Sequence, residues 1–166
     1  MEVGTMANTP LHMTSDQYIT QRVEQYQSWY DNKAVRSKKI YLRMRALSVI
    51  GGGLVPVLVN IPWNASLGGI TITQALVTII GLIVVIIVSL ESVFHYREQW
   101  KNYRSTEQFL GHEKIMFRSK VGRYKNLSED DSFQLFVERI EEAIASENAA
   151  TLNVMAVAIE SVEKKK

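Results

Sequence analysis

The polar side chains best placed to do chemistry in this sequence stand inside an apolar stretch rich in Ile, Val and Leu. At about 100° per residue they fall in one narrow stripe of a helix. Polar groups in such surroundings cost free energy, so the stripe predicts either a helix contact or a water-filled path. The members of the stripe are Thr71, Gln74, Thr78 and Ser89.

Two interpretations of the stripe are open. In the first, the hydroxyls bond the backbone within a tight contact between two helices, which is ordinary for Ser and Thr. In the second, the stripes of several subunits surround an aqueous path and line a pore. The residues alone favour the first interpretation. Gln74 is the exception, because a primary amide needs several hydrogen-bond partners and one pair of helices offers few.

Charged residues mark the ends of the same apolar stretch. Glu91 follows it directly, and Arg43 and Arg45 precede it. An antiparallel pair of helices would bring these residues to one depth, which predicts an ion pair. In a ring of subunits, Glu91 would instead form a mouth that attracts cations.

Signatures of catalysis are missing from the sequence. It contains no Gly-rich phosphate loop, no nucleophile elbow and no HExxH motif. Cys is absent, which excludes disulfides and Cys-based metal sites, and the three His are scattered. We therefore expect no enzyme activity, no cofactor, no metal site and no nucleic-acid partner.

The stretch that holds the stripe is uncharged from Ala46 to Leu90. Residues 46–63 and 70–90 would form helices of about 27 Å and about 31 Å, which match a hydrocarbon core of about 30 Å. We predict a transmembrane hairpin; the alternative is a buried hairpin in a soluble helical protein. Small residues at Ser48, Gly52 and Gly81 are expected to let helices pack closely.

The remaining chain predicts an all-α protein with long cytoplasmic helices beneath the hairpin. Residues 1–14 are expected to be disordered, and Thr14 with Gln17 has the spacing of a capping box. Residues 15–127 form the hairpin and its stalk, with a weak point at Gly111. Residues 128–163 form a C-terminal amphipathic helix or helix pair that provides an oligomerisation surface. Lys and Arg flank both spans and are absent from the connecting loop, which places both termini in the cytoplasm.

The motifs that surround the hairpin are 29–34, Glu91, Trp100, 103–104, Glu107, Leu110, Glu113, Phe117, 136–141 and 146–148. Their order and spacing resemble the SLATT family, the bacterial two-transmembrane effectors associated with SMODS and SLOG proteins. The resemblance covers about residues 18–150 and departs from the family where an aromatic is expected soon after Asn148. It implies a membrane effector of conflict systems, such as antiphage defence, that forms pores when a nucleotide signal is received. We expect no fused nucleotide synthetase or sensor domain, so that any trigger would arrive from a separate protein or ligand.

These observations predict a homo-oligomer in the bacterial inner (plasma) membrane that conducts ions through a channel or pore. A two-helix hairpin cannot enclose a path alone, so conduction requires several subunits. The alternative is a non-conducting scaffold in the lipid bilayer, whose cytoplasmic helices recruit partners.

Overall fold

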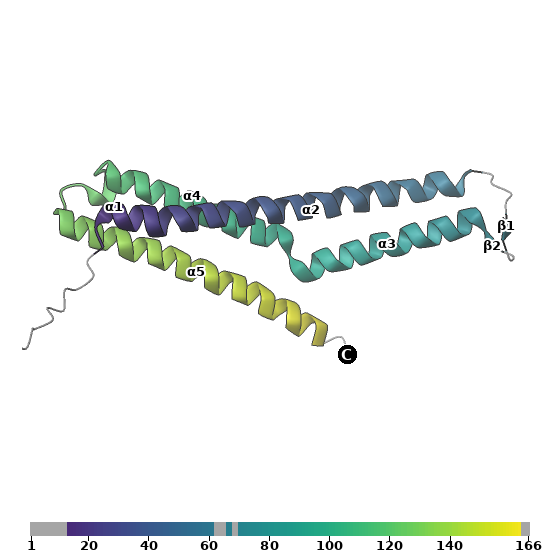
Figure 1. Cartoon of the computed structure of the whole chain (residues 1–166). Coiled ribbons are helices and arrows are strands. Elements are labelled where there is room, and N and C mark those ends of the chain that lie inside the picture. Colours follow the sequence, from purple (N-terminus) through teal and green to yellow (C-terminus); the bar gives the residue numbers. More distant parts are fainter. Residues whose placement is uncertain (1–12, 62–65, 68–69, 164–166) are drawn as a thin grey trace, which may run out of the picture.

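The computed structural model describes residues 13–61, 66–67 and 70–163, and it is helical apart from one pair of two-residue strands. Figure 1 shows an elongated molecule in which α2 runs the full length, with α4 and α5 beside one half and α3 beside the other. The elements are α1 (Ser15–Tyr18), η1 (Ile19–Val23), α2 (Glu24–Val59), β1 (Ser66–Leu67), β2 (Ile70–Thr71), α3 (Ile72–Phe94), α4 (Tyr96–Arg118), η2 (Gly122–Tyr124) and α5 (Glu129–Glu163).

The elements α1, η1 and α2 form one continuous rod. The predicted capping box is confirmed: Thr14 Oγ1 accepts from the Gln17 N–H, and Gln17 Oε1 accepts from the Thr14 N–H. The rod passes through Pro56 and ends at Val59. The helix therefore ends before Trp63, where the sequence predicted the end of the span. Asn60 Nδ2 donates to the Pro56 carbonyl at 2.7 Å. Ile61 disfavours helix because it precedes Pro62.

The second rod is broken where the sequence predicted continuity. His95 has φ 50° and ψ 42°, a left-handed conformation that separates α3 from α4. The predicted weak point at Gly111 was wrong, because Gly111 lies within α4. The chain steps sideways at this joint in Figure 1.

The C-terminal segment is one helix. Ser128 Oγ accepts from the Asp131 N–H at 3.1 Å, and three acidic residues occupy the first turn of α5. The helix then runs without interruption through 146–148. At 1.5 Å per residue it is about 52 Å long, and its end reaches past the α3–α4 joint in Figure 1.

Among the residues whose burial the structure describes, the buried core lies in the half that contains α4 and α5, which we call the polar bundle. Aromatic rings dominate it, and Phe117 stacks on Phe136 with ring centroids 4.5 Å apart. The other half, which we call the apolar hairpin, consists of α2 from residue 46 onward and α3. The core residues of the bundle are Tyr18, Ile19, Val23, Tyr30, Ala34, Tyr103, Leu110, Tyr124, Phe136, Ile140 and Ile144.

By length and composition, two helical runs are apolar enough to cross a membrane: Ser15–Val59 and Ile72–Tyr124. No residue in the apolar window of either run is buried within the chain. The core helix of a soluble protein would be mostly buried, so the apolar hairpin is exposed in a way that a soluble core is not. The expected disorder of residues 1–14 concerns a segment of which 1–12 lie outside the described residues.

Candidate functional site

The two helices of the apolar hairpin meet along a regular seam. Half-buried residues recur at alternating intervals of four and three along both helices. This is the heptad spacing of coiled coils, in which one face of each helix stays against its neighbour. The seam continues the buried positions Tyr30, Ala34 and Ser37 of the polar bundle. Its members are Met44, Ser48, Gly51, Val55 and Leu58 on α2, and Thr73, Val77, Ile80, Val84 and Ile87 on α3.

The polar stripe of α3 lies away from this seam. Gln74, Thr78 and Ser89 are exposed, and Thr71 is half-buried at the start of the helix. With 3.6 residues per turn, the stripe stands roughly 140° around α3 from the seam. The α3 hydroxyl that does lie on the seam belongs to Thr73, which the predicted stripe did not include. The stripe therefore does not form the contact between α2 and α3, and the packing interpretation fails within one hairpin.

Gln74 has a local partner that sequence reasoning missed. Thr71 Oγ1 accepts from the Gln74 N–H at 3.3 Å, and Gln74 Oε1 accepts from the Thr71 N–H at 3.2 Å. This is a second capping box, with the Thr-x-x-Gln spacing already recognised at Thr14 and Gln17. The amide oxygen of Gln74 therefore caps the N-terminus of α3, and this bond needs no partner from another helix.

Hydroxyls in the hairpin also bond locally. Thr78 Oγ1 donates to the Gln74 carbonyl at 2.8 Å, and Ser48 Oγ donates to the Met44 carbonyl at 3.0 Å. Such bonds to the carbonyl four residues earlier remove the need for a partner on another helix. The oxygen of Thr78 keeps its capacity to accept a further hydrogen bond, and Ser89 stands exposed near the other end of the stripe.

The close approach of the two helices occurs at Gly51, not at Gly52. A Cβ added to Gly51 would stand 2.6 Å from Val84 Cγ2. A Cβ added to Gly52 or Gly81 would meet no atom within 4 Å. Of the predicted packing residues, Ser48 lies on the seam, whereas Gly52 and Gly81 make no close contact. A contact of Gly52 or Gly81 with another copy stays a prediction.

The predicted ion pair of Glu91 does not form. Among the described residues, neither Arg43 nor Arg45 lies within ion-pair distance of Glu91. The reason is helical register. Met44 lies at the level of Glu91, two helical turns from the contact of Gly51 with Val84. Arg43 and Arg45 stand directly before and after Met44, so their side chains point about 100° to either side of the seam. The alternative role of Glu91 at a pore mouth stays a prediction.

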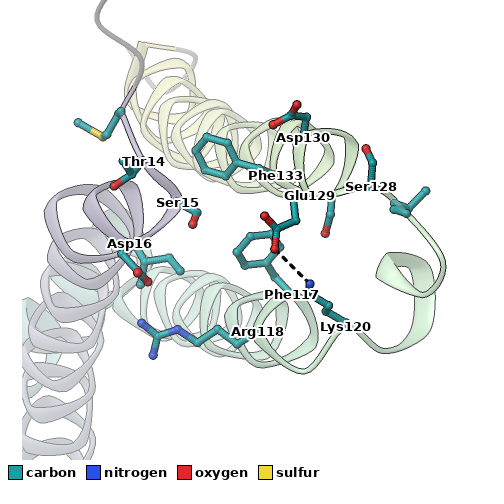
Figure 2. Close-up of a pocket in the computed structure, with 14 residues that line it drawn as sticks. Thr14, Ser15, Asp16, Phe117, Arg118, Lys120, Ser128, Glu129, Asp130 and Phe133 are labelled. Carbon is teal, nitrogen blue, oxygen red and sulfur yellow. Dashed lines mark hydrogen bonds and ion pairs between the residues drawn. The ribbon is translucent and has the colours of Figure 1, made fainter.

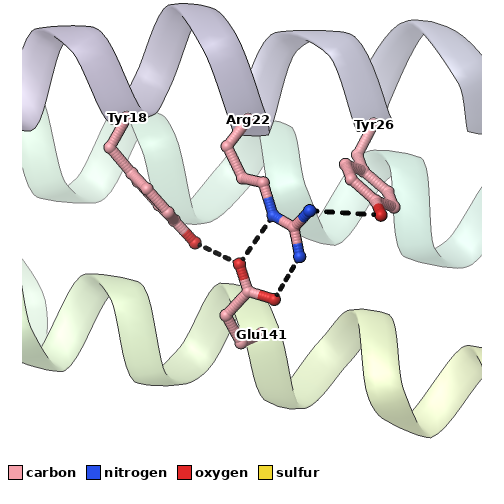
Figure 3. A network of polar contacts seen from close by, with 4 residues as sticks. All are labelled: Tyr18, Arg22, Tyr26 and Glu141. Atoms are coloured by element: carbon pink, nitrogen blue, oxygen red, sulfur yellow. Dashed lines mark hydrogen bonds and ion pairs between the residues drawn. The ribbon is translucent and has the colours of Figure 1, made fainter. Parts of the chain in front are cut away.

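In the polar bundle, a bidentate ion pair holds α5 against α1 and η1. Figure 3 shows Arg22 and Tyr18 converging on the carboxylate of Glu141. Arg22 Nε and Nη2 donate at 2.9 Å and 2.8 Å, and the Tyr18 hydroxyl donates at 2.8 Å. Hydrogen bonding from Arg22 lowers the pKa of Glu141 from its usual value, against the opposing effect of burial. The pair therefore favours the charged carboxylate and holds α5 in place.

A second carboxylate is buried where α4 meets α5. Glu113 accepts from the Tyr124 hydroxyl at 2.6 Å and from Arg139 Nη2 at 2.8 Å. Burial alone would raise the pKa of Glu113, but these two donors and the charge of Arg139 lower it. Burial, followed by the hydrogen bond to Glu113, raises the pKa of Tyr124. This network ties η2 to the core of the bundle.

A third carboxylate, that of the buried Glu147, accepts from the Thr151 hydroxyl at 2.6 Å. Burial, and then the charge of Glu147, raises the pKa of Tyr30. The Tyr30 hydroxyl is buried and forms no hydrogen bond of good geometry with the described residues, although the carboxylate is close enough to affect its pKa. Tyr103 has a pKa raised first by its own burial. These groups lie where α2, α4 and α5 meet.

A cavity of about 640 Å³ opens at the tip of the polar bundle, where the ends of three helices meet. Figure 2 shows the starts of α1 and α5 around it, with Arg118 at the end of α4 and Lys120 just after that helix. Asp16, Glu129 and Asp130 also line the cavity, and Lys120 pairs with Glu129 at 3.4 Å. Charges of both signs are present, so the cavity presents no single charge to a ligand.

One family model matches residues 25–132, and its description is "Protein of unknown function (DUF4231)". The matched segment holds the apolar hairpin, α4 and the first residues of α5. Searches of curated proteins and of solved structures give no match to this chain.

Proposed function

For this chain, which belongs to the DUF4231 family, we propose an oligomeric membrane protein in which the polar stripes of several α3 helices surround an ion-conducting path. The observation that carries the proposal is the position of the stripe: it lies on the exposed side of an apolar hairpin, away from the seam. Copies that meet through this side would bring Gln74, Thr78 and Ser89 together. Polar groups gathered in this way can replace part of the hydration of an ion.

The dimensions of the hairpin are consistent with a membrane of ordinary thickness. The helix α3 is about 35 Å long, which covers a hydrocarbon core of about 30 Å. The apolar part of α2, from residue 46 to Val59, is shorter at about 21 Å. Arg43 and Arg45 precede it, and their long side chains would reach back toward the headgroups and extend the span.

The flanking charges support a topology with both termini, and thus the polar bundle, in the cytoplasm. The bacterial inner membrane is proposed from the resemblance to the SLATT family. The resemblance to the SLATT family adds a role in conflict systems. A separate nucleotide-sensing partner would then act on the bundle, and the joint at His95 is the place where a movement of α4 reaches α3. A nucleotide signal would favour the conducting state through this connection.

The alternative proposal, a non-conducting scaffold, has one observation in its favour. Thr71 Oγ1, Gln74 Oε1 and Thr78 Oγ1 each form a hydrogen bond within α3 or its N-cap, so these three oxygens do not depend on water. In this case the hairpin would anchor the chain in the membrane and the polar bundle would bind partners.

The experiment that separates the two proposals is the recording of ion currents from the purified full chain in planar bilayers, with subunit number measured on the same sample. The test variant combines Thr78→Val with Ser89→Ala, which removes two hydroxyls with little change in shape. Its matched control combines Ile79→Leu with Ile86→Leu, two exposed residues on another face of α3. A third variant, Thr71→Ala, removes the helix cap without adding apolar bulk.

For a pore lined by the stripe, the test variant loses most of its current while its subunit number is unchanged, and the Ile control conducts like the natural chain. Equal current in the test variant and the natural chain would refute α3 as the lining helix. A loss of current in Thr71→Ala together with loss of helix would show that this variant acts through the cap of α3 and not through the lining of the path. The absence of current in the natural chain and in every variant is expected both of the scaffold and of a pore that stays closed without its trigger.

A further inference from the structure

Basic residues gather where the polar bundle meets the apolar hairpin. The chain has no Asp or Glu from Asn32 to Leu90, whereas the part of α2 before the hairpin carries several Lys and Arg. Between Asn32 and Arg45, α2 has no acidic residue that could offset this positive charge. The basic residues are Lys33, Arg36, Lys38, Lys39, Arg43 and Arg45.

Only some of these cations are engaged within the chain. Lys38 Nζ stands 5.2 Å from the ring centroid of Trp100, and Lys33 Nζ stands 5.2 Å from that of Trp29. The negative charge of Asp31 is taken by Arg104 of α4 at 2.8 Å. These contacts engage Lys33, Lys38 and Arg104 within the chain. The remaining basic residues of this part of α2 are available to bind another molecule.

Three of the remaining cations share one face. Arg36, Lys39 and Arg43 are exposed, and none of them forms a hydrogen bond or ion pair with the described residues. Their spacing of three and four residues places them on one side of α2, roughly 100° around the helix from the seam. We call these three residues the basic ridge.

The same face of α2 continues into the hairpin as apolar surface. The next residues at three- and four-residue spacing are Leu47, Ile50 and Leu54, which are 56%, 59% and 43% exposed. Along one helix face, three cations are therefore followed directly by three aliphatic side chains. An amphiphile with a negatively charged head and an apolar tail matches this order.

We propose that the basic ridge binds the headgroups of anionic phospholipids in the leaflet next to the polar bundle, with their acyl chains along Leu47, Ile50 and Leu54. This inference rests on the membrane insertion proposed above. Arg binds phosphate oxygens with two parallel N–H donors, and Lys adds a point charge. A nucleic acid or an acidic protein would use the cations but not the apolar continuation, so the lipid fits the whole face.

The experiment measures lipid binding to the purified full chain in neutral detergent by native mass spectrometry. Phosphatidylglycerol and phosphatidylcholine are added separately, and inorganic phosphate is added as a competitor. The test variant carries Arg36→Gln, Lys39→Gln and Arg43→Gln. Its control carries Arg118→Gln, Lys120→Gln and Lys125→Gln, an equal loss of charge among exposed residues at the far tip of the bundle.

We expect phosphatidylglycerol to bind at least about tenfold more tightly than phosphatidylcholine, since each basic residue near an anionic surface contributes about fivefold. The ridge variant loses this preference, the tip control keeps it, and Arg43→Gln alone gives a smaller loss. Inorganic phosphate at the same concentration does not compete. Equal preference in the ridge variant and the tip control overturns the proposal, as does full competition by inorganic phosphate.

A separate measurement distinguishes failure of this inference from failure of the proposed function. The natural chain is reconstituted in vesicles of phosphatidylcholine alone and washed with high salt. A chain that washes off is not inserted, which overturns the proposed function and this inference together. A chain that stays inserted but shows no preference for phosphatidylglycerol in detergent overturns the lipid site alone.

Discussion

Gly51 of α2 packs directly against Val84 of α3, so closely that a Cβ on Gly51 would lie 2.6 Å from Val84 Cγ2. This contact sets the distance between the two helices of the apolar hairpin. With Gly51 opposite Val84, the heptad seam places Met44 opposite Glu91 two turns away. The hairpin is therefore most sensitive to side-chain volume at this one position.

Substitution of this glycine tests the seam. We expect Gly51→Val to destabilise the hairpin by about 1–3 kcal/mol, since overpacking forces helices apart. The matched control is Gly52→Ala, where the added methyl meets no atom within 4 Å. That change should be neutral or stabilising by up to about 1 kcal/mol through helix propensity. The measurement is unfolding in detergent micelles, and equal stability of the two variants would contradict the seam.

Removal of the buried charge at Glu113 should destabilise the polar bundle. The Glu113 side chain is 2% exposed and binds Arg139 at 2.8 Å, so Glu113→Gln leaves a partly buried guanidinium without its counter-ion. Breaking a buried pair on one side costs about 3–5 kcal/mol. The control is Glu138→Gln on the exposed face of α5. Chemical denaturation followed by circular dichroism measures both, and a loss below about 1 kcal/mol in Glu113→Gln would argue against the network.

Acid should weaken the same network. Burial alone would raise the pKa of Glu113, but Arg139 and Tyr124 hold it below its ordinary value of 4.5. A lowered pKa contributes stability that is present above the unfolded value and lost as the pH falls through the folded value. The stability gap between the natural chain and Glu113→Gln should therefore narrow as the pH drops below about 4.5. A gap that stays constant down to strongly acidic pH would disprove this account.

Several features were predictable because they depend on local sequence. The apolar spans and the capping box at Thr14 each follow from residues a few positions apart. The capping box of Gln74 was equally local, since Thr71 stands three residues before it, and it was missed because the amide was matched only to partners on a second helix. A Thr-x-x-Gln pattern at the start of an apolar run was the signal.

Other features depend on contacts that no local pattern reveals. Ser48, Gly52 and Pro56 recur every four residues, which suggested that Gly52 faces the partner helix. The seam instead inherits its register from Tyr30 and Ala34 in the polar bundle, which turns Gly51 inward. The pairing of Arg22 with Glu141 joins residues 119 positions apart, so sequence spacing gave no hint of it.

Alkaline pH should unfold the polar bundle and ionise its buried tyrosines in one step. Burial raises the pKa of Tyr18, Tyr30, Tyr103 and Tyr124 above the ordinary value of 10.0. A raised pKa contributes stability that is complete below the unfolded value and lost as the pH rises above it. Tyrosinate absorbance and helical circular dichroism should therefore change together above about pH 10. Ionisation of all tyrosines with the helices intact would contradict the burial seen here.

The joint between α3 and α4 depends on a left-handed backbone at His95. With φ at 50°, this residue adopts a conformation that glycine tolerates, that His visits occasionally, and that β-branched residues avoid. We expect His95→Gly to match or exceed the natural chain in stability and His95→Ile to lose about 1–2 kcal/mol. The control is Arg97→Ile on the exposed face of α4. Gln99 would not serve, because its side chain donates to the Phe94 carbonyl at 2.9 Å.

The same variants test whether the joint connects the bundle to the hairpin. If the left-handed backbone at His95 sets the angle between α3 and α4, His95→Ile should favour one continuous helix through this position. The far ends of α3 and α4 would then move relative to each other. Spin labels at exposed Ile115 of α4 and exposed Ile83 of α3 would report that movement as a changed distance. His95→Gly should leave the distance distribution centred where it is but broader, because glycine permits the left-handed state without enforcing it. Identical distributions in all three proteins would show that packing against α2, rather than the backbone at His95, sets the angle.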